Sequence, residues 1–130
     1  MGELLRLAFG TDDGFGGRAR IGLVVLEGDQ TVEAELVALW PEGVTAFVTR
    51  IQMEDQVTAE TLLAMEGRIP VAAGMLPTAF AFDVVGYGCT SASTLIGEDR
   101  VDAAIRVAHP DVPNTNPMTA AVAAFTALGA

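Results

Sequence analysis

The chain has very few residues of the kinds that cross-link proteins or bind metals. Its 130 residues include one cysteine, Cys89, and one histidine, His109, which we expect in a solvent-facing loop. A lone cysteine cannot form an internal disulfide, and the two residues together fall short of the four ligands of a structural zinc site. No signal-peptide pattern opens the sequence. We therefore expect a cytoplasmic protein without a structural metal site.

Positive charge is also scarce. Seven basic residues stand against 17 acidic ones, which gives a formal net charge of -10. This argues against nucleic acid and anionic membranes as partners, because both are bound by basic surfaces. No charge follows Asp111, but Pro113 and Pro117 divide this end, and the remaining stretch is too short to span a membrane. This composition does not exclude a small anionic substrate, since backbone N–H groups and hydroxyls bind carboxylates locally.

The hydrophobic pattern predicts one α/β domain, because apolar runs alternate with stretches of helical spacing. Such alternation is typical of a parallel sheet with helices on its faces. The predicted strands are 21–26, 44–50, 83–87 and a short one near 112–113; the predicted helices are 31–40, 58–69, 91–96, 99–108 and 117–128. Residues 71–76 fit helix or strand. The glycine-rich residues 1–20 are predicted to form a flexible lead-in, so the domain occupies 21–130.

Three residues are predicted to cap helices. Thr31, Thr58 and Asn116 each precede a predicted helix, and Ser, Thr, Asn and Asp side chains satisfy the free N–H groups there. Pro117 then occupies the first helical position, where proline is favoured. Gly67 and Pro70 are expected to interrupt or kink the helix that follows Thr58.

Ligands of such sheets bind at the loops that follow the strands, here 27–31, 50–55 and 88–93. Cys89 ends the third strand and opens a helix, where N–H groups and the helix dipole favour a thiolate and bind anions. The thiol is thus a candidate nucleophile or proton shuttle, or else a small buried hydrophobe. Thr90, Ser91 and Ser93 beside it are candidate anion binders, and at least one of them is expected to cap the helix.

Polar residues also follow the first and second strands. Asp29 and Gln30 are candidate substrate contacts, with a simple polar turn as the alternative. Arg50 ends the second strand and could pair with a substrate carboxylate. Its alternative is a surface ion pair with Glu54 or Asp55. No glycine-rich nucleotide-binding pattern follows the first strand.

The last predicted helix has no charge on any face between Met118 and Leu128. A helix that is apolar all round is normally buried all round. A four-stranded domain can cover one face of a terminal helix. We therefore expect a second domain or a partner subunit to cover the rest.

The residues around Cys89 resemble a family motif. Residues 83–91, Asp-Val-Val-Gly-Tyr-Gly-Cys-Thr-Ser, resemble the first-cysteine motif of maleate cis-trans isomerases and arylmalonate decarboxylases, within the aspartate/glutamate racemase superfamily. Residues 21–25 with 31–33 look like that family's opening strand and helix, and residues 115–121 look like the segment leading to its mid-chain helix. The resemblance covers about residues 20–130 and is strongest to the maleate isomerase-like proteins of ectoine utilisation operons.

This resemblance implies a flavodoxin-like, three-layer domain with a four-stranded parallel sheet, one half of a pseudo-symmetric two-domain fold with the active site between the halves. It implies that Cys89 is a nucleophile that adds to the double bond of a small, maleate-like dicarboxylate. Rotation about the resulting single bond and loss of the thiolate then give the trans isomer. Thr90 and Ser91 would bind a substrate carboxylate, and no cofactor is involved.

Two differences from the family lead to alternatives. Asp29 stands where the family usually has a carboxylate-binding asparagine, and its charge would repel a carboxylate. The second domain and its cysteine are absent from these 130 residues, so we expect the chain to be inactive alone unless a homo-oligomer or a missing domain completes the site. The alternatives are a decarboxylase or racemase of small carboxylic acids, or a non-catalytic ligand-binding or assembly protein linked to ectoine catabolism.

Overall fold

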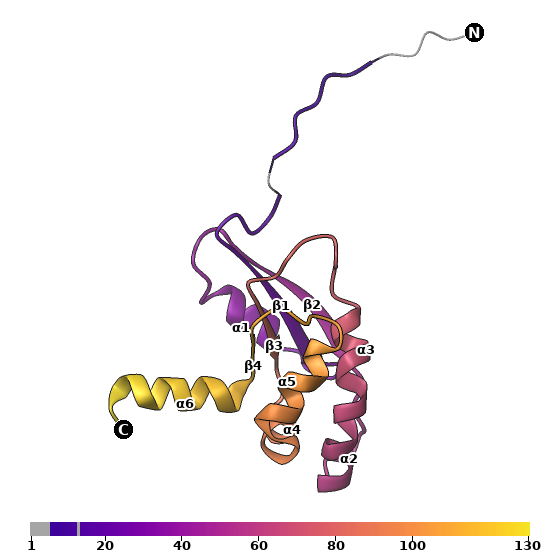
Figure 1. Ribbon diagram of the computed structural model, residues 1–130, viewed down its shortest axis with the longest axis vertical. Coiled ribbons are helices and arrows are strands. Elements are labelled where there is room, and N and C mark those ends of the chain that lie inside the picture. Colours follow the sequence, from indigo (N-terminus) through magenta and orange to yellow (C-terminus); the bar gives the residue numbers. More distant parts are fainter. Residues whose placement is uncertain (1–5, 13) are drawn as a thin grey trace, which may run out of the picture.

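The computed structural model describes residues 6–12 and 14–130. Within them, four parallel strands form one sheet in the order β2-β1-β3-β4 (Figure 1). The predicted α/β fold with a parallel four-stranded sheet is thus confirmed for these residues. The predicted lead-in partly lies outside the described residues, at 1–5 and 13, and its flexibility stays a prediction. The strands are β1 (Ala19–Leu26), β2 (Val44–Ile51), β3 (Val84–Tyr87) and β4 (Asn114–Thr115).

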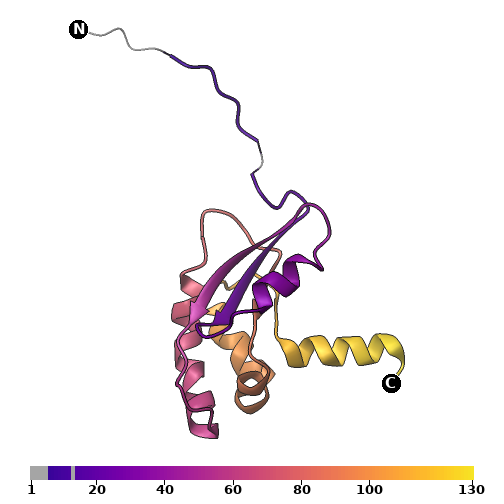
Figure 2. The ribbon, with the colours of Figure 1, turned by 180° about the vertical axis from the view of Figure 1, so that it is seen from behind.

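Helices lie on both faces of the sheet and give it three layers (Figures 1 and 2). One face carries α2 to α5, and α1 lies on the opposite face. The last helix, α6, projects away from the body. The helical elements are α1 (Val32–Val37), α2 (Ala59–Ala64), the 3-10 turn η1 (Met65–Arg68), α3 (Ile69–Gly74), α4 (Thr90–Ile96), α5 (Glu98–Arg106) and α6 (Pro117–Leu128).

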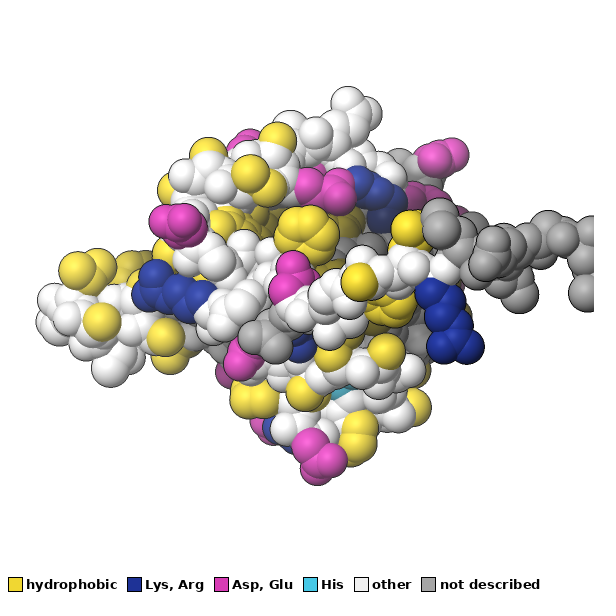
Figure 3. All heavy atoms as spheres, turned by 90° about the horizontal axis from the view of Figure 1, so that it is seen from above, with side chains coloured by type: hydrophobic (Ala, Val, Ile, Leu, Met, Phe, Trp, Pro, Cys, Tyr) yellow, Lys and Arg dark blue, Asp and Glu magenta, His cyan; other side chains and the backbone are white. Residues whose placement is uncertain are grey.

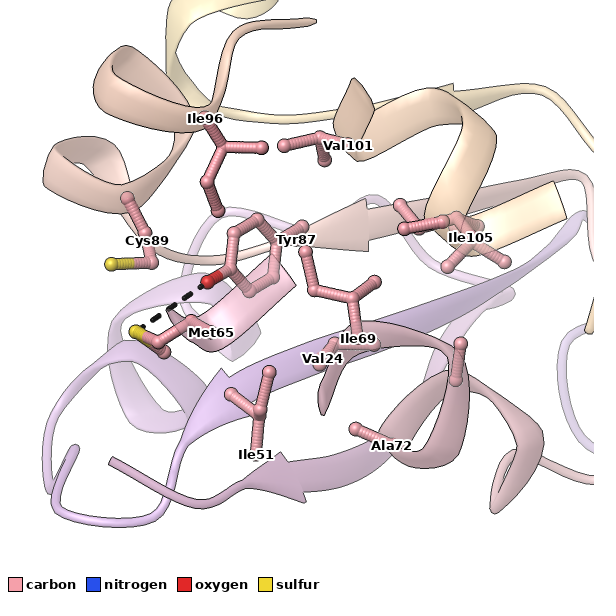
Figure 4. Close-up of a cluster of buried hydrophobic side chains, with 14 of the residues drawn as sticks. Val24, Ile51, Met65, Ile69, Ala72, Tyr87, Cys89, Ile96, Val101 and Ile105 are labelled. Carbon is pink, nitrogen blue, oxygen red and sulfur yellow. Dashed lines mark hydrogen bonds between the residues drawn. The ribbon is translucent and has the colours of Figure 1, made fainter. Parts of the chain in front are cut away.

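The main core lies between the sheet and α2 to α5. Alternate residues of a strand point to the same face, so Val24, Val85 and Tyr87 all enter this core. They meet Ile69 and Ile105 from the helices (Figure 4). Each fully buried aliphatic side chain of this kind stabilises the fold by about 1.5–3 kcal/mol. This core fixes the edge of the sheet at which Cys89 lies.

His109 belongs to this core, and the prediction that it faces solvent is wrong. Its side chain is 7% exposed, and its Nε2 lies 2.9 Å from the carbonyl oxygen of Ala73. Its ring meets Phe82 edge-on, with the ring centroids 5.7 Å apart. The contact with Ala73 gives one ring nitrogen of this buried histidine a hydrogen-bond partner.

Two of the three predicted caps are confirmed. The Thr58 hydroxyl accepts the N–H of Thr61, and the Asn116 side chain accepts the N–H groups of Met118 and Thr119. The prediction for Thr31 is wrong, because its side chain makes no capping hydrogen bond. The carboxylate of Asp29 accepts the N–H groups of Thr31 and Val32 at the start of α1 instead.

Helix boundaries differ from the prediction where proline intervenes. The first helix ends at Val37 rather than near Trp40, since the residue before Pro41 disfavours helical backbone. The interruption predicted at Gly67 and Pro70 is confirmed as η1 followed by a new helix, α3. Most of the ambiguous stretch 71–76 is helical, up to Gly74.

The projecting helix α6 exposes apolar side chains. Val122, Phe125 and Leu128 are 57%, 59% and 80% exposed. Figure 3 shows hydrophobic side chains on this projection, at the left of the molecule. Within the described residues, no helix is long and apolar enough to cross a membrane. That a second domain or subunit covers α6 stays a prediction.

Candidate functional site

Cys89 lies where β3 passes into α4, at the carboxyl edge of the sheet. The N–H of Gly88 donates to the carbonyl oxygen of Val24 at 2.8 Å, which extends the β1–β3 pairing to the residue before the cysteine. Cys89 itself is the N-cap of α4, with extended backbone. Its side chain is 6% exposed. The thiol is therefore held by regular structure on both sides, and only a small part of its surface is accessible.

A cavity of about 100 Å³ opens beside the thiol. Most of its lining is apolar, and it draws on the ends of β1 and β3, on the segment after β2, and on α2. The predicted loops 50–55 and 88–93 both reach it, whereas none of residues 27–31 lines it. The lining residues are Leu26, Met53, Glu54, Gln56, Val57, Thr61, Leu62, Met65, Cys89 and Ser91.

Leu62 and Met65 form a wall of the site that the sequence reasoning did not assign to it. Both residues lie in the predicted helix 58–69. Their place at the site arises because α2 and η1 pack against α4 and bring both side chains to the edge of the sheet. The position of this helix directly after a carboxyl-edge loop was a signal that could have identified them.

Tyr87 is another residue of the site that sequence reasoning missed. Its side chain is 1% exposed, and its hydroxyl lies 3.8 Å from the sulfur of Met65 (Figure 4). Burial raises the pKa of Tyr87 well above its usual value, and the neighbouring Cys89 raises it further by charge and by hydrogen bonding. The phenol thus stays protonated beside the thiol.

The three hydroxyl residues after Cys89 occupy different environments. Ser91 lines the cavity, and Thr90 is exposed nearby. Ser93 is buried, and its Oγ has no hydrogen-bond partner among the described residues. The expectation that one of them caps the helix is wrong, because Cys89 is the N-cap and α4 has no side-chain capping bond. The first N–H groups of a helix have no partner within the helix. At the start of α4, next to Cys89, no side chain caps these N–H groups.

Asp29 closes the turn between β1 and α1. Its Oδ1 accepts hydrogen bonds from the backbone N–H groups of Thr31 and Val32, both at 2.9 Å. The N–H of Val32, followed by that of Thr31, lowers the pKa of the Asp29 carboxyl. Gln30 is exposed within the same turn. Neither Asp29 nor Gln30 lines the Cys89 cavity, and their role toward a substrate stays a prediction.

Arg50 ties this turn to β2. Its guanidinium donates to the carbonyl oxygens of Leu26 and Asp29, both at 2.9 Å, and pairs with Glu33. Arg50 does form a surface ion pair, but the predicted partners, Glu54 or Asp55, are wrong. Glu54 pairs with Arg68 instead. Arg50 does not line the Cys89 cavity, and its contact with a substrate stays a prediction.

Electrostatics set a limit on how this site can hold an anion. Among the described residues, no arginine or histidine lines the Cys89 cavity, and Glu54 is the charged residue at its rim. A carboxylate bound here would therefore depend on the N–H groups at the start of α4 and on hydroxyls such as that of Ser91. No group of metal-binding side chains occurs within the described residues.

No protein-family model and no curated protein sequence matches the chain. Solved structures do match it. The maleate isomerase Iso of Pseudomonas putida S16 aligns at a TM-score of 0.69 and 28% identity, over 85% of this chain and 50% of that one. The chain is similar to maleate isomerases.

Two further structures of such enzymes carry chemical information. A cysteine-to-alanine variant of the Pseudomonas enzyme, solved with maleate, matches at a TM-score of 0.70 and 28% identity, over 85% of this chain and 49% of that one. A cysteine-to-serine variant of the Nocardia farcinica maleate cis-trans isomerase matches at 0.70 and 29%, with the same coverage. That variant holds a covalently bound succinylcysteine intermediate.

The chain spans about half the length of the maleate isomerases that it matches. The likeness predicted from the residues around Cys89 is thus confirmed at the level of the maleate isomerases, with 26–29% identity. The link to ectoine utilisation and the place of the chain as a first domain stay predictions.

Proposed function

We propose that the chain is the nucleophile-bearing half of a cysteine-dependent, cofactor-independent cis-trans isomerase of a small, maleate-like dicarboxylate. The observation that carries this proposal is the position of Cys89 at the carboxyl edge of the sheet, beside a cavity, in a fold shared with maleate isomerases. A related enzyme forms a covalent succinylcysteine, which supports thiolate addition as the chemistry.

The reaction needs one nucleophile and no external reactant. The Cys89 thiolate forms a C–S bond to one alkene carbon of maleate, and the π electron pair moves onto the other carbon and its carboxylate. The former double bond is now single, so the chain of the substrate rotates about it. The electron pair then re-forms the double bond as the C–S bond breaks. This step regenerates the thiolate and releases the trans dicarboxylate.

The start of α4 is the proposed carboxylate contact. Thr90 and Ser91 would bind one carboxylate through their N–H and hydroxyl groups, and Ser91 already lines the cavity. Anions at a helix start are stabilised by these N–H groups and by the helix dipole. Because this half brings no cation to the cavity within the described residues, the second carboxylate would be bound by another half of the site.

That other half is either a second α/β domain or a second copy of the chain. The coverage of about half of each matched isomerase and the exposed apolar side chains of α6 support this proposal. The same half would cover α6 and close the cavity beside Cys89. On this account the 130 residues are inactive unless the second half is present.

The test is conversion of maleate to fumarate, followed by proton NMR, in the assembled protein. Replacing Cys89 with alanine should lower the rate by about a thousandfold or more, as loss of a catalytic nucleophile typically does. Thr94→Ala is the matched control, since Thr94 is exposed on α4 and its hydroxyl donates to the carbonyl oxygen of Thr90. Wild-type rates in Cys89→Ala would remove the proposal and favour a ligand-binding or assembly role.

A second candidate is a decarboxylase or racemase of small carboxylic acids on the same fold. The apolar wall of Met53, Leu62 and Met65 favours it, because such a wall fits a substrate with an apolar substituent. Parallel assays with arylmalonates and amino acids distinguish the two. Turnover of an arylmalonate with no turnover of maleate would select the decarboxylase.

A further inference from the structure

The hydroxyl of Tyr87 is buried with a very weak partner. The side chain is 1% exposed, and the described hydrogen bond of its hydroxyl is to the Met65 sulfur at 3.8 Å. A thioether is a weak acceptor, whereas a phenol is a good donor. A buried donor with so poor a partner is costly, and it calls for a better acceptor nearby.

The thiol of Cys89 is a candidate for that acceptor. Tyr87 and Cys89 are two residues apart in extended backbone, so their side chains point to the same face. Figure 4 shows the Tyr87 hydroxyl, the Met65 sulfur and the Cys89 thiol gathered at one end of the core. The nearness of Cys89 is also among the causes that raise the pKa of Tyr87, after burial.

We propose that the Tyr87 hydroxyl donates a hydrogen bond to the Cys89 thiolate and so positions and stabilises the nucleophile. The role rests on the proposed function, in which Cys89 attacks as a thiolate. No proton is transferred: the O–H bond stays intact, the hydrogen bond weakens when sulfur binds carbon, and it re-forms when the thiolate leaves. Tyr87 is thus a positioning residue that contacts the nucleophile rather than the substrate.

Among the described residues that line the cavity, no cationic side chain stabilises a thiolate. The segment after β2 brings Glu54 to the cavity, whose negative charge opposes a thiolate. Leu62 and Met65, on the α2 and η1 side, bring no titratable group. Burial keeps the pKa of Tyr87 high, so this donor stays protonated wherever the thiolate forms.

The test is the pH dependence of Cys89 alkylation by iodoacetamide, which reports on one site because the chain has a single cysteine. In Tyr87→Phe the midpoint of the pH–rate profile should move up by about one pH unit, the equivalent of a tenfold change in thiolate stability. Glu54→Gln should move it down. Thr94→Ala, the exposed control on α4, should leave it unchanged. An unmoved midpoint in folded Tyr87→Phe overturns the inference.

A second measurement does not depend on the folding of that variant. The chain has a single tyrosine, so biosynthetic 3-fluorotyrosine places one fluorine, at Tyr87. Its fluorine resonance should titrate with the midpoint of Cys89 alkylation, and this titration should vanish in Cys89→Ala. A resonance that ignores the ionisation of the thiol contradicts the inference.

Failure of the proposed function gives a different result. In that case Cys89→Ala retains maleate turnover, whatever the alkylation profile of Tyr87→Phe. If only the present inference fails, Cys89→Ala is inactive and the alkylation profile of Tyr87→Phe matches that of the wild type.

Discussion

Among single residues, Asp29 has a structural role. Its carboxylate accepts hydrogen bonds from two backbone N–H groups at the start of α1. These bonds lower its folded pKa below the ordinary value of 3.8. A lowered folded pKa contributes stability that is present above 3.8 and is lost as the pH falls through the folded value. Asp29→Asn keeps an oxygen acceptor but removes the charge, so the urea midpoint at pH 7 should fall slightly and the acid-dependent loss should shrink.

The matched control is Glu42→Gln, an exposed carboxylate in another turn. This variant should lose as much stability as the wild type between roughly pH 5 and pH 2, the range in which carboxylates become protonated. Urea unfolding followed by circular dichroism across this pH range measures both variants. Equal acid sensitivity in wild type and Asp29→Asn would mean that the two N–H bonds do not favour the charged carboxylate.

Sequence reasoning found Cys89 because local features mark it, namely an apolar strand, small residues and a following helix. It missed Tyr87 and His109 as buried polar groups, because their partners Met65 and Ala73 lie far away along the chain. Arg50 illustrates the same limit. Its ionic partner is Glu33, which the parallel pairing of β1 with β2 brings near, and not the acidic residues next in sequence.

Helix α6 begins at a capping box, which gives a prediction at the scale of elements. The Asn116 side chain accepts the N–H groups of Met118 and Thr119, and the Thr119 hydroxyl accepts the N–H of Asn116. Asn116→Ala removes this cap and should lower the free energy of unfolding by about 1 kcal/mol, with a loss of helical signal.

Urea titration followed by circular dichroism measures this change. Thr126→Ala in the same helix is the control, since its hydroxyl bonds only the carbonyl oxygen of Val122 on an exposed face. It should stay within about 0.5 kcal/mol of the wild type. Equal effects of the two variants would contradict a specific role for the cap.

Most elements were predictable because their signals are local. The apolar run of β1, the cap at Thr58 and the Asn116-Pro117 start of α6 each predicted an element that the structure contains. The two-residue strand β4 was placed slightly too early, near 112–113, since so short a strand has no periodicity of its own. Its position depends on pairing with β3, which is a tertiary contact.

The exposed apolar side chains of α6 give the prediction at the scale of the whole molecule. We expect the chain to self-associate through this helix when no second domain covers it, because exposed apolar patches favour association. Phe125→Asp should weaken that association by about tenfold or more.

Sedimentation equilibrium over a range of protein concentrations measures the association. Val107→Asp is the control, because Val107 is an exposed apolar residue at the end of α5, 73% exposed against 59% for Phe125. It should leave the association constant unchanged. Identical masses for wild type and Phe125→Asp at every concentration would show that α6 is not the contact.

The charge-free sequence of α6 already predicted a helix with too much apolar surface for one small domain. Its direction away from the body could not be predicted, since nothing local to Met118–Leu128 specifies what it packs against. A hollow of about 410 Å³ on the α1 face, lined by residues that include Leu23, Trp40 and Val48, could not be predicted either. Its shape depends on how α1 packs on the sheet.

The central claim is that Cys89 forms a covalent bond to the substrate. The most direct measurement is peptide mass spectrometry of the assembled protein, quenched with acid during turnover of maleate. The account predicts a succinyl adduct on the peptide that contains Cys89, formed and lost as fumarate accumulates, and absent in Cys89→Ala. Full conversion of maleate to fumarate with Cys89 unmodified at every quench time would contradict it.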